Sequence, residues 1–67
     1  MNFEKRQALR RLEAKYLYLR WKINRHERFV ELAATRKQTT ALDMFKTQLT
    51  SYREEQEEVW SEIRSFY

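Results

Sequence analysis

The 67-residue chain contains no cysteine, no glycine and no proline, and it has a single histidine. The lack of cysteine excludes disulfides and thiolate metal sites, and one histidine offers little for zinc. Without glycine and proline, the commonest loop formers, most of the chain is expected to be helical. A chain of this length forms one domain at most, and with no covalent or metal support its small core is expected to need oligomerisation.

Long apolar runs are missing as well. No stretch approaches the ~20 apolar residues that span a bilayer. The opening residues, Met-Asn-Phe-Glu-Lys-Arg, lack the apolar centre of a signal peptide. We therefore expect a cytoplasmic protein that does not associate with membranes.

What the chain does contain is two stripes of mostly apolar residues with the alternating three- and four-residue spacing of packed helices. We call these residues the seam: Leu9, Leu12, Tyr16, Leu19, Ile23, His26, Val30 and Ala33, then Leu42, Phe45, Leu49, Tyr52, Gln56, Val59, Ile63 and Phe66. Folding the chain about position 37.5 pairs the two stripes antiparallel, so that the numbers of each pair sum to 75.

One continuous helix could not pack the two stripes against each other. Ala33 and Leu42 are nine residues apart, and at about 100° per residue the two stripes would lie on opposite sides of an unbroken helix. The predicted fold class is therefore all-α, an antiparallel two-helix hairpin of the helical coiled-coil type. An open, domain-swapped dimer would bury the same stripes and stays as the alternative.

The predicted organisation is a single helical-hairpin domain over residues 1–67, with helix 1 over about 3–36, a turn over about 37–40 and helix 2 over about 40–66. Thr40, with Asp43 three residues later, is the expected N-cap of the second helix. Complementary flanking charges support the antiparallel pairing. The expected ion pairs are Lys15 with Glu62, Lys22 with Glu55, and Glu27 with Lys46.

The first helix has more apolar surface than the seam requires. A second stripe with the composition of an interface combines aromatic, apolar and arginine side chains: Tyr18, Trp21, Arg25, Phe29 and Leu32. We expect this stripe to form a partner or dimer interface, in which two hairpins pack into a four-helix bundle or another protein's helix docks. The predicted function is a small non-enzymatic protein-protein interaction module, such as a regulator, adaptor or assembly factor, that acts as a homodimer.

An unequal distribution of charge suggests a different function. Residues 1–37 hold eleven Lys or Arg and four Glu, a net charge of +7, whereas residues 38–67 hold three basic and six acidic residues, a net charge of −3. Basic side chains interleaved with aromatic rings suit phosphates and unpaired bases. The alternative is therefore a nucleic-acid-binding regulator whose candidate contacts are Arg10, Arg11, Lys15, Arg20, Lys22, Arg25 and Arg28.

Two polar residues interrupt the seam, and we expect a structural role for each of them. His26 is expected to be structural, with its imidazole reaching a Tyr hydroxyl or the bundle edge, and Gln56 is expected to help set the register. The sequence shows no nucleophile beside an orienting base, no Gly-rich phosphate loop and no Glu three residues before His26 as in di-iron bundles. We therefore expect no enzyme activity, no small-molecule substrate, no cofactor, and no catalytic, cofactor-binding or metal-binding residue.

Overall fold

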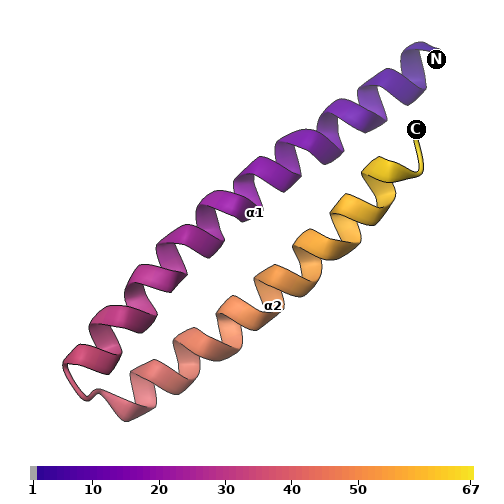
Figure 1. The fold of residues 1–67 in the computed structure, drawn as a ribbon. Helices are drawn as coiled ribbons and strands as arrows, with labels where there is room; N and C mark the ends of the chain where they lie inside the picture. The colour runs from indigo at the N-terminus through magenta and orange to yellow at the C-terminus, as the bar shows by residue number, and fades with distance from the viewer. Residues whose placement is uncertain (1) are drawn as a thin grey trace.

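The computed structural model describes residues 2–67, so Met1 of the predicted domain lies outside the described residues. Two helices, α1 over Phe3–Thr35 and α2 over Thr39–Arg64, lie side by side and run in opposite directions, which brings both ends of the chain together (Figure 1). The described part is all-helical with no strand, and its Cα atoms extend over 52 × 14 × 13 Å. The predicted all-α two-helix hairpin is confirmed.

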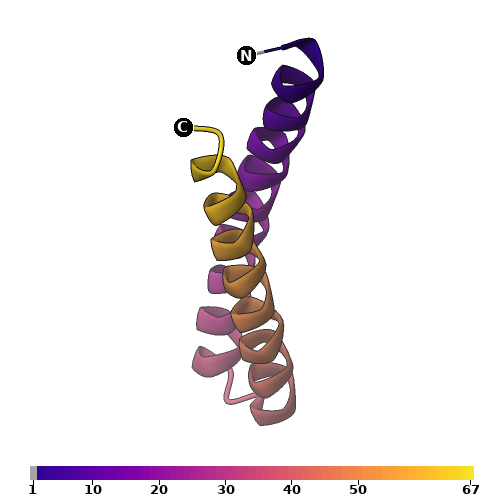
Figure 2. The same cartoon turned by 90° about the vertical axis from the view of Figure 1, so that its right-hand side faces the viewer.

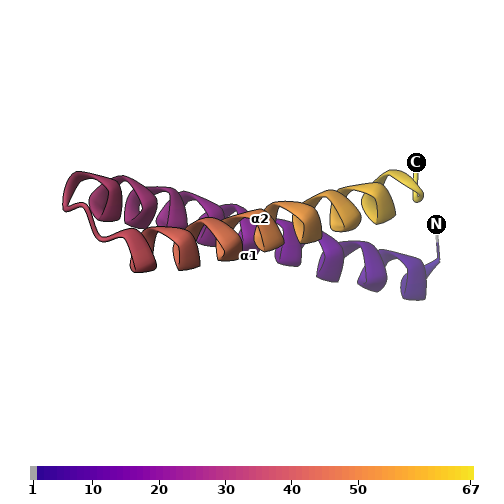
Figure 3. The same cartoon turned by 90° about the horizontal axis from the view of Figure 1, so that it is seen from below.

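The two helices wrap around each other rather than lying strictly parallel. Seen from below, α1 and α2 cross at a shallow angle near their middles (Figure 3), and the view along the edge shows the same gradual winding (Figure 2). This winding keeps a seven-residue repeat in contact along two long helices, because a straight helix would carry the stripe away from its partner. The seam therefore stays between α1 and α2 along their length.

Helix α1 begins with a side-chain cap and ends with a turn that usually requires glycine. The Asn2 Oδ1 atom accepts the backbone N–H of Lys5 at 2.8 Å, which satisfies one of the free donors of the first turn. At the other end, the N–H of Gln38 donates to the Ala33 carbonyl at 2.9 Å and the N–H of Lys37 to the Ala34 carbonyl at 3.2 Å. This bonding pattern is the Schellman motif, and Lys37 adopts its left-handed position with a φ of 57°.

The predicted N-cap at Thr40 is wrong. The residue before α2 is Gln38, whose side chain makes no capping hydrogen bond, and the first α-helical bond runs from the Leu42 N–H to the Gln38 carbonyl at 2.8 Å. Thr40 therefore lies inside the first turn of the helix. The left-handed residue Lys37 reverses the chain in so few residues that α2 starts before the threonine with the best capping side chain.

The core consists of the predicted seam. Within residues 2–67, every buried residue belongs to it, and the set comprises Leu19, Ile23, His26, Ala33, Leu49, Val59 and Ile63. The other nine seam residues are half-buried. The register also agrees, because the His26 ring contacts both Phe45 and Tyr52, which lie one turn on either side of its predicted partner Leu49.

The ion pairs between the helices differ from those predicted. Within residues 2–67 there are two, Lys15 Nζ to Glu55 Oε1 at 3.3 Å and Arg53 Nη2 to Glu27 Oε1 at 2.9 Å. Each keeps a predicted residue of α1 but takes a partner on α2 two turns away from the predicted one. Exposed ion pairs contribute little free energy, so they do not determine which of several nearby charges a long side chain meets.

Within residues 2–67, neither helix contains an apolar stretch long enough to cross a bilayer.

Candidate functional site

The second stripe of α1 is uncovered in the hairpin. Tyr18, Trp21 and Leu32 expose 55%, 52% and 51% of their surface, although all three are large apolar or aromatic residues. Together with Arg25 and Phe29 they form what we call the aromatic face of α1. A folded protein rarely leaves several such side chains together in water unless another surface covers them.

Arg25 is held in the middle of the aromatic face by the rings on either side of it. Its guanidinium carbon lies 5.3 Å from the Trp21 ring centroid and 5.5 Å from that of Phe29. Phe29 in turn rests on the seam, with its ring 5.3 Å from the Phe45 ring. An open groove follows this arrangement along α1, lined by Trp21, Asn24, Arg25, Arg28, Phe29 and Leu32. A partner would therefore meet a cation and several rings whose positions are already restricted.

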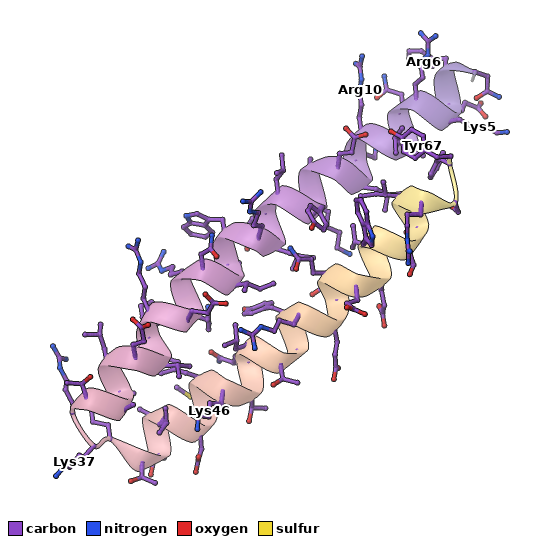
Figure 4. All side chains as sticks on the ribbon, in the orientation of Figure 1. Lys5, Arg6, Arg10, Lys37, Lys46 and Tyr67 are labelled. Atoms are coloured by element: carbon purple, nitrogen blue, oxygen red, sulfur yellow. The ribbon has the colours of Figure 1, made fainter. Side chains whose placement is uncertain are left out.

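The seven candidate nucleic-acid contacts do not form one track. Lys15 pairs with Glu55 on one edge of the hairpin, and Lys22 Nζ on the same edge lies 5.8 Å from the Tyr18 ring centroid. Arg20 comes two turns before Glu27 and so lies on the opposite edge. Arg10 projects away from α2 near the chain ends (Figure 4). Arg25 and Arg28 line the groove beside Trp21, and these two combine charge with aromatic surface.

His26 is buried in the seam, and its two ring nitrogens contact one oxygen atom on each helix. Its Nδ1 lies 3.0 Å from the Lys22 carbonyl oxygen and its Nε2 lies 3.1 Å from the Gln48 Oε1 atom. Both neighbouring atoms are oxygens, so each contact places a hydrogen-bond acceptor beside a ring nitrogen. The imidazole does not reach a Tyr hydroxyl. Instead its ring packs edge-on against the Tyr52 ring, with centroids 4.9 Å apart.

Sequence reasoning missed a second exposed apolar group, near the chain ends. Trp60 packs against the seam residue Tyr16 with ring centroids 5.6 Å apart, and it lines an open groove with Leu17 and Tyr67. Leu17 is 60% exposed. One signal was available in the sequence, because Leu17 precedes Trp21 by four residues and such residues are neighbours on a helix surface. That Trp60 of α2 belongs to the same group could be recognised only in the three-dimensional structure.

The uncovered surface of α1 carries aromatic, apolar and cationic side chains. In the described part of the chain, no three His, Asp or Glu side chains lie close enough together to hold a metal ion. No family model matches the chain, and the comparisons with curated proteins and with solved structures found no match either. The aromatic face and the charges around it are therefore the features that bear on function.

Proposed function

We propose that this chain is a non-enzymatic protein-protein interaction module that acts as a homodimer, in which two hairpins pack into a four-helix bundle. One observation carries the proposal: Tyr18, Trp21 and Leu32 are each more than half exposed on one side of α1. Covering them removes apolar area from water, which stabilises an assembly by roughly 25 cal/mol for each Å² buried. The resulting homodimer would be a regulator, adaptor or assembly factor that acts through its surface.

The small core supports the same conclusion. All seven buried residues lie in a single row between two helices, and a hairpin of this kind has no second layer to shield the outer sides of those helices. Small domains without disulfides or metals commonly gain stability by oligomerisation. In a four-helix bundle, each pair of helices covers an exposed side of the other pair. Self-association therefore adds core where the isolated hairpin has little.

The test is the molar mass in solution at several concentrations, measured by light scattering or analytical ultracentrifugation. We expect twice the chain mass, falling toward the monomer on dilution. Leu32→Ala should raise the dimer dissociation constant at least about tenfold, because a two-fold axis removes the contact twice. Leu17→Ala, which removes an exposed leucine beside the aromatic face, is the control and should have a smaller effect. A well-folded chain that stays monomeric at high concentration would overturn the proposal.

Nucleic-acid binding through Arg25, Arg28 and Trp21 is the second candidate, favoured by the groove that these residues share. Labelled single-stranded RNA and duplex DNA titrated at several salt concentrations measure it. Phosphate contacts make affinity fall steeply with salt, by roughly one power of the salt concentration for each neutralised phosphate. Tight, salt-dependent binding by a monomeric chain would replace the homodimer as the proposed function, whereas no binding at low salt would remove this candidate.

A cytoplasmic location is part of the proposal and rests on the composition alone. Fractionation of cells that produce a tagged chain measures it.

A further inference from the structure

The side of α1 next to the seam carries a regular stripe of its own. Between Arg11 and Leu32 its residues are spaced four and three apart, and we call them the basic stripe: Arg11, Lys15, Tyr18, Lys22, Arg25, Phe29 and Leu32. None of these side chains is buried in the hairpin. The cations occupy the part toward the chain ends, and Phe29 and Leu32 follow toward the turn. This spacing is that of a second packing seam.

Helix α2 carries a matching stripe on the same side of the hairpin. Its residues have the same spacing, and we call them the acidic stripe: Met44, Gln48, Ser51, Glu55, Glu58 and Glu62. The contact of Lys15 with Glu55 across the seam, at 3.3 Å, places the two stripes on one side. Met44 lies near the turn and is 51% exposed, and the three glutamates follow toward the chain ends. One broad side of the hairpin is therefore basic along α1 and acidic along α2, and apolar near the turn on both helices.

Two copies can stack these sides about a two-fold axis in two ways that keep the helices aligned. If the turns lie at the same end, α1 of each copy packs on α2 of the other. If the turns lie at opposite ends, α1 packs on α1 and α2 on α2. These two arrangements bury the same surface, so the charge of the contacting helices decides between them.

Helix α1 carries nine Lys or Arg and four Glu, a net charge of +5, whereas α2 carries three Lys or Arg and six Asp or Glu, a net charge of −3. Contact of α1 with α1 would bring like charges together, which is destabilising, whereas contact of α1 with α2 pairs opposite charges. We infer that a second copy of this chain docks with its turn at the same end, its α2 covering the basic stripe and its α1 covering the acidic stripe.

This inference rests on the proposed homodimer and specifies its interface. With the turns at one end, each residue meets the residues that lie at its own level in the hairpin. Leu32 then packs against the partner's Met44 near the turn, and Lys22 and Lys15 lie beside the partner's Glu55 and Glu58 respectively. Arg25 lies beside the partner's Ser51, and Trp21 flanks this position because the Arg25 guanidinium lies 5.3 Å from the Trp21 ring. Apolar residues thus meet apolar residues, and cations meet carboxylates, in one register.

The distance between the two turns tests the arrangement directly. The chain has no cysteine, so Gln38→Cys places a single spin label at the exposed turn of each copy. Turns at the same end lie one to three helix diameters apart, about 10 to 30 Å, whereas turns at opposite ends lie near the 52 Å length of the hairpin. A short distance is the expected result. A long distance would overturn this inference while leaving the homodimer, and a monomeric chain without an intermolecular signal would overturn both.

Charge reversal gives a second test that needs no label. Lys15→Glu and Glu58→Lys should each weaken the homodimer about tenfold, because each puts like charges in contact twice. An equimolar mixture should form a heterodimer of nearly wild-type affinity, since both of its contacts are complementary again. Glu57→Lys, about 100° around α2 from Glu58, is the matched control and should change affinity less than about threefold. If α1 packed on α1, Lys15→Glu would relieve repulsion and tighten the homodimer, which would overturn the inference.

Discussion

Replacing Lys37 with glycine should stabilise the hairpin. Lys37 has a φ of 57°, in the left-handed region that costs a residue with a Cβ roughly 1 to 2 kcal/mol. Glycine avoids that cost, but it loses about 0.5 to 1 kcal/mol more conformational freedom on folding. The difference predicts a gain of about 0.5 to 1 kcal/mol for Lys37→Gly in each chain.

The neighbouring positions make this prediction specific to one residue. Arg36 and Gln38 have φ angles of −85° and −88°, which any residue adopts without strain. Arg36→Gly and Gln38→Gly therefore only add disorder to the unfolded chain, and each should cost about 0.5 to 1 kcal/mol. The sign of the effect thus changes twice over three consecutive residues.

Thermal or urea unfolding followed by far-ultraviolet circular dichroism measures these differences, with all variants compared at one protein concentration because self-association shifts the midpoint. Lys37→Gly should raise the melting temperature by about 2 to 8 °C, and the two control variants should lower it by similar amounts. One unbroken helix through this segment would make all three glycines destabilising by about 1 kcal/mol. A Lys37→Gly variant that melts below the wild-type chain would therefore refute the assigned turn.

Three further predictions concern the packing of the two helices, and each uses the same unfolding assay. Leu19, only 2% exposed, should cost about 2 to 4 kcal/mol when replaced by alanine, whereas Leu17→Ala should cost about 0.5 kcal/mol or less; equal losses would contradict the seam. Gln48→Ala should cost about 1 to 2 kcal/mol because it leaves a buried ring nitrogen unpaired, and a double-mutant cycle with His26→Ala should reveal a coupling that a purely steric role would lack. Arg53→Ala should cost less than about 1 kcal/mol, with the loss shrinking at high salt; a large effect that ignores salt would show that this ion pair is not an ordinary exposed one.

The location of the core could be predicted because it depends on periodicity alone. The spacing of residues such as Leu19 and Val59 places them on one side of each helix whatever the helix contacts. The nine-residue interval between Ala33 and Leu42 then requires a reversal of the chain, since only a bend brings the two stripes together. Both arguments use helix geometry, which is the same in every protein.

The surface and the turn could be predicted only in part. The aromatic face followed from the same periodicity, but Trp60 joins Leu17 and Tyr67 only after the hairpin has closed. The position of the turn could be predicted only approximately. Which residue takes the left-handed conformation, here Lys37, depends on where the two packed helices leave room for the chain. A sequence without glycine contains no residue that marks this place.

The amino-acid sequence by itself determined that two amphipathic helices form and which side of each is buried, because those features repeat along a single helix and need no partner to be recognised. Only the tertiary structure decided that Gln48 satisfies His26, that Glu27 meets Arg53 rather than Lys46, and that Arg25 is held between two rings. These contacts are made by side chains with several partners within reach and small differences in free energy between them. Which partner each side chain contacts depends on the distance between the two packed helices and on their rotation. A residue pattern along the chain does not contain that information.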